Sequence, residues 1–375
     1  MKLKLHTDLD LLKVGKPIEL LIPFTGLSDK EDEPGAMKYG RFNEYMEVGA
    51  SLFELAPIEH CDACVLPIFY DVLEDQREFE RKIAPFIKKV EAHGKKILIF
   101  VGHDVLDIRI PVKNAIIFNS AIDKSKQPAN VFPWPHFFED FLKRYNAGDL
   151  RIRRKHSKPI VGFCGYAPPL HVRMGKEKII GLVKLAANYL GLLQRFPNRI
   201  AHSYRARAII GLMRSTRVIP NFRLKSNFAF GPNGMNSGNT EESDFDFRKG
   251  FVENILESDY TLCVRGLGNN SIRFFETLCC GRIPVFVNTD CVLPFEDVID
   301  WKSLCVWVEE KNIDNVADAV VRFHAQISEE DFIDLQKKLR NIWEEYLSPV
   351  GFFKHLDSYV DRAYEAANSD SLSEA

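Results

Sequence analysis

The sequence predicts an α/β protein made of two successive domains, each a parallel sheet covered by helices. Short apolar runs typical of buried strands alternate with helical patterns along the chain, which is the order expected of parallel sheets. This alternation starts again near residue 160, after a polar and basic stretch at 151–159 that we interpret as a linker. The 375 residues, 46% of them hydrophobic, are enough for two cores of ordinary size.

In the first half, apolar runs predict strands at 18–24, 61–70, 95–104 and 114–121. Between 76 and 94 the apolar residues recur at helical spacing. Gly94 is a suitable C-cap for this helix, whereas Pro85 is expected to kink it. A further helical pattern at 136–145 ends this half.

The second half repeats the same architecture. Strands are expected at 160–166, 260–266, 282–288 and 303–310, and helices at 176–195, 247–259, 270–281 and through most of 313–368. The Gly- and Asn-rich stretch 221–247 is expected to be a long surface loop. The expected division is therefore an N-terminal domain at 1–150, a second domain at 151–345, and a helical segment at 346–375 that crosses back to the first.

Charge, hydropathy and cysteine usage exclude several classes of protein. The formal net charge of −2 gives no reason to expect nucleic acid as a partner. No window approaches ~18 uninterrupted apolar residues, so we expect no integral membrane segment, although peripheral association is compatible with the sequence. The start MKLKLHTDLDLL has no secretory apolar region, which favours a cytoplasmic protein with its eight cysteines reduced. Cys61 and Cys64 form a lone C-x-x-C, which favours buried thiols over a metal or redox site.

The residues with the most chemical content follow the expected strand at 260–266. Arg265 and Gly266 stand at its carboxyl end, where the glycine permits a close backbone approach to a ligand. Asn270 or Ser271 is placed to cap the next helix. Because a helix N-terminus offers free N–H groups and a positive dipole, this turn suits a phosphate.

Charged side chains around the same helix extend this interpretation. Arg265 or Arg273 can neutralise a diphosphate, which an arginine is able to bind bidentately. Glu276 lies five residues after Ser271, and a carboxylate there can accept both hydroxyl hydrogens of a ribose. A routine strand–loop–helix unit explains the helix alone equally well. The combination of the two arginines, the glycine loop, the serine and the glutamate favours a nucleotide site.

This segment, from Asp259 to Glu310, resembles the exostosin family, glycosyltransferase family 47. The chain reads SDYTLCVRG, then NSIRFFETLCCGRIPVFV, then LPFEDVIDW. The family has a Ser-x-aromatic-x-Leu strand, an Arg-Gly loop, a Ser-x-Arg pair and a Glu, followed by Gly-x-Ile-Pro-Val, Leu-Pro-Phe and Asp-Trp. Residues 160–346 match more loosely, and the N-terminal half matches only in outline, through ILIFVGHD.

The resemblance implies a GT-B-like fold, with two Rossmann-like domains facing a cleft and C-terminal helices. It also implies an inverting transfer from a nucleoside-diphosphate sugar, with a UDP-sugar favoured, to a hydroxyl of a polysaccharide or glycolipid acceptor. Carried over by position, Arg265, Ser271, Arg273 and Glu276 face the diphosphate and the ribose. Animal and plant members are Golgi-anchored, so the expected lack of an anchor makes this chain more similar to soluble bacterial members that build surface polysaccharide.

Two further sets of arginines are less specific. Gly165 and Arg173, around the end of the strand at 160–166, resemble the family's Phe-x-Gly segment and are a second candidate phosphate contact. A structural turn with a surface arginine is an equal alternative for them. Arg205 and Arg207 are weaker candidates for a site role.

Inverting transfer needs a base that deprotonates the acceptor hydroxyl. In a GT-B-like layout the base is expected on the first domain, across the cleft. Asp104 is the first choice and His103 the second, because both follow the strand ILIFVG. Either residue is also able to brace the sheet edge instead. Asp71, at the end of the neighbouring strand, is a weaker candidate.

The remaining alternatives concern a metal and the class of function. Asp244 and Asp246 spell D-x-D, but they precede a helix in a polar loop rather than follow a buried strand, so we expect neither a metal nor a cofactor. Arginines and a helix dipole can offset the leaving-group charge instead. One rival is an NAD-dependent oxidoreductase, which G-x-G-x-x-G after the first strand would indicate, and IPFTGLSDK is not that motif. The other rival is a nucleotide- or glycan-binding protein without turnover.

Overall fold

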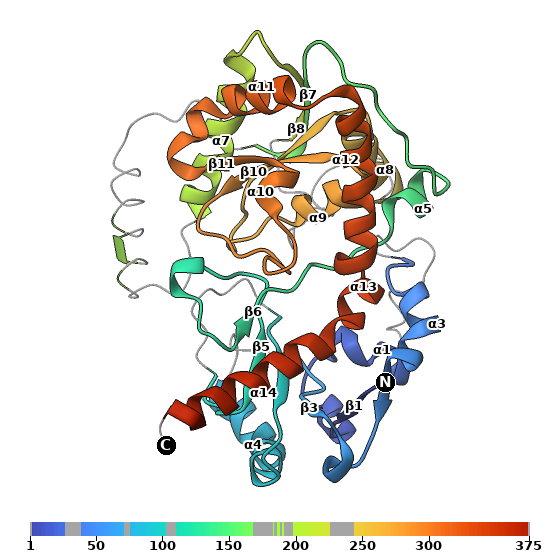
Figure 1. Cartoon of the computed structure of the whole chain (residues 1–375), viewed down its shortest axis with the longest axis vertical. Helices are drawn as coiled ribbons and strands as arrows, with labels where there is room; N and C mark the ends of the chain where they lie inside the picture. The colour runs from blue at the N-terminus through green and yellow to red at the C-terminus, as the bar shows by residue number, and fades with distance from the viewer. Residues whose placement is uncertain are drawn as a thin grey trace.

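The structure is a computed structural model of the chain. It describes residues 2–26, 39–70, 76–102, 110–167, 183, 186–187, 190, 198–225 and 244–373. Two parallel sheets form its two halves, and Figure 1 shows them stacked one above the other with helices around each. The predicted α/β class, with two parallel-sheet halves and C-terminal helices, is confirmed.

The first sheet has the strand order β2-β1-β3-β4-β5-β6, and all its neighbouring pairs are parallel. Its strands are β1 Leu3–His6, β2 Phe53–Leu55, β3 Ala63–Val65, β4 Ile97–Phe100, β5 Ala115–Phe118 and β6 Val131–Phe132. The helices of this half are α1 Ile22–Thr25, α3 Asn43–Leu52 and α4 Gln76–Ala92. Every residue of β3, β4 and β5 is buried, as expected of strands covered on both faces.

The second sheet has the order β11-β10-β9-β7-β8, again with parallel pairs throughout. Its strands are β7 Ile160–Tyr166, β8 Ile219–Lys225, β9 Tyr260–Cys263, β10 Ile283–Asn288 and β11 Val306–Glu309. Its helices are α7 Asn198–Arg214, α8 Asp244–Leu256, α9 Ile272–Cys279, α10 Trp301–Leu304, α11 Val316–Gln326 and α12 Glu329–Ile342.

The chain passes between the halves twice. The first passage, which we call the connecting segment, is 133–159 and contains the short helix α5 Phe141–Tyr145. The second runs from the π-helix η6 Trp343–Leu347 through α13 Pro349–Lys354 into α14 Leu356–Ser373. Figure 1 shows α14, in red, lying across the first half.

Helix α14 is part of the first half's packing. The ring of Tyr359 lies 5.1 Å from the ring of Phe118 on β5 and 5.1 Å from that of Phe132 on β6. The hydroxyl of Tyr364 donates to the carbonyl of Asp62 at 3.1 Å and accepts from the amide of Lys96 at 3.2 Å. The C-terminal helix thus covers strands that the chain made some 240 residues earlier, as the numbering of Phe118 and Tyr359 shows.

The carboxyl edges of the two sheets meet. The side-chain amide of Asn270, after β9, donates to the carbonyl of Ser120, after β5, at 2.8 Å. The amide of Asn269 donates to the carboxylate of Asp123 at 2.7 Å, and the backbones of Asp123 and Cys291 form an antiparallel bridge. The loops after the strands of one half are therefore hydrogen-bonded to those of the other.

Some predicted elements are wrong. Residues 18–24 were expected to form a strand, but they form a 3-10 turn at Glu19–Leu21 and the short helix α1, with a proline in its first turn. An apolar run this short does not distinguish a strand from a buried helix by its periodicity. The first strand is instead β1, where only Leu5 is buried, so the segment lacks an apolar run.

Two further boundaries differ from the expectation. Helix α5 begins only at Phe141, because the carboxylate of Asp140 accepts the amides of Leu142 and Lys143 and caps the helix there. The stretch expected to be a loop from 221 begins inside β8, and its last residues form the start of α8. Pro85 lies inside α4 without ending the helix.

The cysteine prediction is confirmed, since all eight thiols are free and buried. The sulfur atoms of Cys61 and Cys64 lie 4.0 Å apart, and burial raises the pKa of both thiols, which keeps them protonated. Within the part of the chain that the structure describes, no helix is both long and apolar enough to cross a membrane.

One close contact between sheet and helix gives a test of this fold. A Cβ atom on Gly162 of β7 would lie 2.2 Å from Oγ of Ser258 and 3.2 Å from the carbonyl of Asn254, so Gly162→Ala is expected to destabilise the fold by about 1–3 kcal/mol. Gly250→Ala is the control: it lies within α8, and its Cβ would meet Arg223 only at 3.6 Å, so a gain of up to about 1 kcal/mol is expected. Urea unfolding measures both, and equal midpoints for the two variants would contradict the packing described here.

Candidate functional site

The candidate site lies at the carboxyl edge of the second sheet, where β7 and β9 end side by side. Strand β9 leads through Val264 to Arg265 and Gly266, and a short loop then enters α9. Among the described residues, no atom lies within 4 Å of the position that a Cβ on Gly266 would take, so these residues leave the backbone there open to a ligand. Arg265 itself is 4% exposed, and its Nη2 donates to the carbonyl of Leu267 at 3.3 Å.

Ser271 is the N-cap residue of α9, as expected, but its hydroxyl makes no capping hydrogen bond. Its backbone is extended, with φ −134° and ψ 104°, and its carbonyl accepts the amide of Phe274 at 2.8 Å. The side chain of Asn270, the other expected cap, is used instead to reach Ser120 and, at 3.0 Å, Nε2 of His136. The first N–H groups of α9 therefore find no acceptor in the N-cap side chain of Ser271, although that of Phe274 is bonded to its carbonyl, and such a helix start suits an anion.

Arg273 lies against the end of β7. Its Nη2 donates to the carbonyl of Cys164 at 2.5 Å, and its guanidinium lies 4.4 Å from the ring centroid of Phe163 and 5.3 Å from that of Phe251. Burial lowers the pKa of this arginine, although the charge of Glu276 opposes that shift. The predicted contact of Gly165 with a phosphate stays a prediction, and this glycine lies in β7 beside Arg273. It has φ +139°, and a Cβ on it would lie 3.0 Å from Arg273 Nη2.

Arg205, on α7, was a weaker candidate in the sequence, and the structure places it close to Arg273. Its Nη1 donates to the carbonyl of Tyr166 at 3.1 Å, and its guanidinium lies 5.9 Å from the ring of Phe163, the ring that Arg273 also covers. Burial and, to a smaller extent, the positive charge of Arg273 together lower the pKa of Arg205 to about 10. Two arginines thus share one aromatic ring of β7, that of Phe163.

These two arginines have unused donors. The Nε atoms of Arg205 and Arg273 are shielded from solvent and have no hydrogen-bond partner among the described residues. No carboxylate contributes to the pKa shift of Arg205, and the nearby Glu276 is paired with Arg248 at 3.1 Å. Unsatisfied buried donors and like charges both cost free energy, and a bound anion would relieve both costs. The arrangement therefore suits a multiply charged anion.

Glu276 is 5% exposed, so its carboxylate is nearly enclosed. Burial raises its pKa, whereas the positive charges of Arg248 and Arg273 lower it. The structure brings Glu276 and Arg273 together on α9, one turn from Ser271, and places Arg265 at the neighbouring strand end. The predicted contact between Glu276 and a ribose stays a prediction.

Other predicted residues do not join this cluster. Arg207 is part-exposed, with 40% of its side chain open to solvent, and it forms a bidentate ion pair with Asp314 at 2.9 and 2.6 Å. Asp244 and Asp246 lie in the first turn of α8, and Asp246 is exposed. No cluster of three or more His, Cys, Asp or Glu suited to a metal occurs within the described ranges. His103, Asp104, Asp71 and Arg173 lie outside the described residues.

Two titratable groups of the first half do face this edge, and the sequence did not single them out. The Asp123 carboxylate lies 2.7 Å from Asn269 Nδ2. Burial raises its pKa, although the charges of Arg265 and Lys126 oppose that shift. His136 contacts Asn270. Both residues come soon after strands of the first sheet, β5 and β6. Their position after a strand is the sequence feature that could have identified them as candidates.

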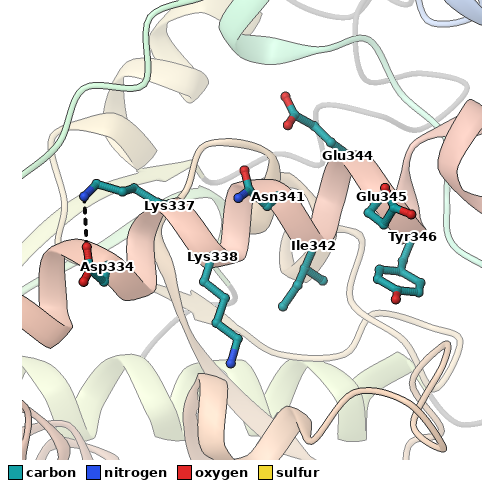
Figure 2. Close-up of a pocket in the computed structure, with 8 residues that line it drawn as sticks. All are labelled: Asp334, Lys337, Lys338, Asn341, Ile342, Glu344, Glu345 and Tyr346. Carbon is teal, nitrogen blue, oxygen red and sulfur yellow. Dashed lines mark hydrogen bonds and ion pairs between the residues drawn. The ribbon is translucent and has the colours of Figure 1, made fainter.

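A separate groove runs along α12 and η6, and Figure 2 shows the side chains that line it. They are Asp334, Lys337, Lys338, Asn341, Ile342, Glu344, Glu345 and Tyr346. Several of these charges already pair along the surface, as Lys337 does with Asp334 at 2.9 Å and Glu345 with Lys354 at 2.6 Å. This pattern is typical of a solvated helix face, and the groove contains none of the residues discussed above.

Comparison with known proteins bears on the segment that forms the site. Residues 223–323 match the model of the exostosin GT47 domain. The chain is 33% identical over 119 residues to Exostosin-1 of Drosophila melanogaster, which covers 32% of this chain and 14% of that protein. It is 27% identical over 120 residues to the Exostosin-1 homolog of Caenorhabditis elegans, covering 30% of each. The predicted resemblance to the exostosin family is confirmed over this segment, and the chain matches less than a third of the length of these relatives.

Among solved structures, a glycosyltransferase from Rickettsia africae aligns over 96% of this chain and 98% of its own, with 9% sequence identity and a TM-score of 0.34. A likeness of that size supports no conclusion about this chain.

The anion site gives a test with a matched control on one helix. Arg205→Gln removes an unsatisfied donor and a charge at the site, so it is expected to weaken inorganic pyrophosphate binding about tenfold, as Arg273→Gln is. Arg207→Gln removes an arginine two residues away that is part-exposed and already paired with Asp314, so binding should be unchanged. Titration calorimetry at fixed ionic strength measures all three. Equal affinities for Arg205→Gln and Arg207→Gln would show that the anion binds elsewhere.

Proposed function

We propose that the protein is an inverting, metal-independent glycosyltransferase that moves a sugar from a nucleoside-diphosphate sugar, a UDP-sugar first, to a hydroxyl of a glycan or glycolipid. One observation carries the proposal: Arg205 and Arg273 lie on the same aromatic ring with buried Nε atoms that no described residue satisfies. Arg273 and the N-terminus of α9 lie inside the segment 223–323 that matches the exostosin GT47 domain, and Arg205 reaches them from α7, outside that segment.

The chemistry follows from charge. In glycosyl transfer the bond between the anomeric carbon and the diphosphate oxygen breaks, and negative charge grows on the departing diphosphate. Arginines and helix N–H groups that are already in place stabilise that charge without reorganising, and they act more strongly where water is excluded. Arg205, Arg265 and Arg273 supply the cations in this proposal, and Ser271 begins the helix that supplies the N–H groups. No metal or cofactor is required for these roles.

The acceptor hydroxyl needs a base from the other half, because in an inverting transfer it attacks the face opposite the diphosphate. Asp104 is the proposed base and His103 the alternative, since both follow β4 closely in the sequence. The base takes the hydroxyl proton as the oxygen bonds to the anomeric carbon. The proposal also places the reaction in the cytoplasm, with peripheral contact to a membrane if the acceptor is a glycolipid.

The first experiment is a thermal-shift panel with UDP, GDP, dTDP, CMP and NAD, because a ligand that binds the folded state raises its apparent stability. A shift with a nucleoside diphosphate and none with NAD is expected. A shift with NAD alone would favour the oxidoreductase. If a diphosphate binds but no donor sugar in a panel is hydrolysed or transferred, with or without acceptors, the protein is a binding module instead.

Activity then tests the donor residues. Arg273→Ala and Glu276→Ala are each expected to lower turnover more than about tenfold while the circular dichroism spectrum is retained, because each removes stabilisation of the charged transition state or of the ribose contact. Arg207→Ala is the control and should keep wild-type turnover. Wild-type rates in both site variants would refute the assignment.

The base has its own signature. Asp104→Asn is expected to abolish transfer and leave the affinity for the nucleoside diphosphate unchanged, because the base contacts the acceptor and not the diphosphate. Transfer rate and diphosphate affinity are measured on the same preparation. Surviving transfer would move the base to His103, which His103→Gln examines in the same way.

A further inference from the structure

A further arginine next to the anion site is buried between two carboxylates. Arg248, on α8, is 5% exposed and lies between two carboxylates. Its Nη1 is 3.1 Å from Oε1 of Glu276, and its Nε is 3.2 Å from Oε1 of Glu139 in the connecting segment. The guanidinium of Arg248 thus links Glu276 of the candidate site to Glu139 of the connecting segment.

The surroundings of this trio exclude water. The guanidinium lies 4.7 Å from the ring centroid of Phe141 and 5.3 Å from that of Phe251. The carboxylate side chains of Glu139 and Glu276 are 1% and 6% exposed, and the hydroxyl of Tyr145 donates to Glu139 at 3.1 Å. Arg273 covers the same Phe251 ring at 5.3 Å. The charges therefore alternate from Glu139 through Arg248 and Glu276 to Arg273.

The ionisation of Glu276 depends on this order. A buried carboxylate stays charged only if cations and donors compensate for the water it has lost. When ionised it only accepts hydrogen bonds, and its two oxygens can take both hydroxyl hydrogens of a ribose. When protonated it must itself donate one. A site that binds a ribose through Glu276 therefore needs this carboxylate to be ionised and fixed in direction.

We propose that Arg248 is a positioning residue that keeps Glu276 ionised and aimed at the nucleotide, and that Glu139 competes for the same guanidinium and so limits this effect. The inference rests on the proposed function, because it assumes that Glu276 meets the ribose of the donor. Arg248 contacts no donor atom in this scheme. It acts only through the carboxylate that it holds.

The groups that face Glu276 from each element agree with this proposal. Arg248 faces it from α8 and Arg273 from its own helix, while Glu139 faces it from the connecting segment. Burial raises the pKa of Glu276, the two arginines lower it, and the charge of Glu139 raises it again. The thiols of Cys263 and Cys280 also lie near Glu276, and burial raises their pKa to about 12, so they are uncharged at neutral pH.

Removal of Arg248 should therefore make nucleotide binding depend on pH. In Arg248→Gln, Glu276 is expected to take up a proton near neutral pH, which weakens UDP binding about tenfold at pH 7. The loss should shrink as the pH rises toward 9, because the carboxylate ionises again, while the affinity of the wild type stays nearly constant. If GDP or dTDP binds the wild type more tightly than UDP, that nucleotide is the probe.

A second substitution separates this role from simple packing. Glu139→Gln in the Arg248→Gln background removes the like charge beside Glu276, so UDP should bind severalfold more tightly to the double variant than to the single one at pH 7. Glu139→Gln alone leaves Arg248 to Glu276 and should not weaken binding. Arg223→Gln is the matched control, because Arg223 also pairs with a glutamate near the end of α8, Glu257 at 3.1 Å, but on the exposed surface.

Several results would overturn the proposal. They are wild-type affinity in Arg248→Gln, a loss that is the same from pH 6 to pH 9, or no recovery in the double variant. If Arg248→Gln fails to fold, Arg248→Lys takes its place, with a smaller loss of the same pH dependence expected because lysine keeps a charge but cannot bridge both carboxylates.

A readout without nucleotide keeps this proposal distinct from the proposed function. Carbon-13 NMR of labelled glutamate carboxyl groups, with Glu276→Gln used to assign the signal, follows the ionisation of Glu276 directly. The titration is expected to move to higher pH in Arg248→Gln than in the wild type, and an unchanged titration would refute the role of Arg248. If the wild type binds no nucleoside diphosphate, the proposed function fails by that result alone, while the carboxyl titration still decides what Arg248 does.

Discussion

The rest of the structure depends on two adjacent carboxylates in the connecting segment, Glu139 and Asp140. Each forms an ion pair with a buried arginine from a different helix of the second half. Arg248 of α8 meets Glu139 at 3.2 Å, and Arg340 of α12 meets Asp140 at 2.6 Å. Asp140 also caps α5. Isolated buried charges would be expensive, but here each is paired, and the pairing fixes the direction of the segment that leaves the first sheet. Because this segment joins the two sheets, its direction determines how their carboxyl edges face each other.

The candidate site uses the opposite arrangement. There the cations outnumber the carboxylates available to them: Arg205 and Arg273 lie on one phenylalanine, and Glu276 is shared with Arg248. The same physical rule explains both regions, because a buried charge requires a partner. In the connecting segment the chain itself provides the partner. At the edge of the second sheet, the partner in our proposal is the diphosphate of the substrate.

The second half of the fold was more predictable from the sequence than the first. The strands β7, β9, β10 and β11 are apolar runs between clear turns and occur where the sequence predicts them, whereas β8 overlaps a stretch that was expected to be a loop. Strand β1 has one buried side chain and no run, so its pairing with β2 and β3 depends on contacts that no local pattern records. In the site, Arg273 could be predicted from the sequence because of its spacing from Ser271. Arg205 was not, because only the tertiary fold brings α7 to the end of β7, and Arg207 looks the same in sequence.

The path of α14 has a consequence for the order of assembly. The second half is in effect inserted within the first, whose packing includes the rings of Phe118 and Tyr359 at 5.1 Å, from positions far apart in the chain. During synthesis the strands of the first half leave the ribosome early, yet the helix that covers them leaves only after the whole second half. The inserted half is then able to close its own sheet first. The half whose strands are translated first is therefore completed only after the inserted half has been made, and until then the rings of Phe118 and Phe132 lack the cover that α14 gives them.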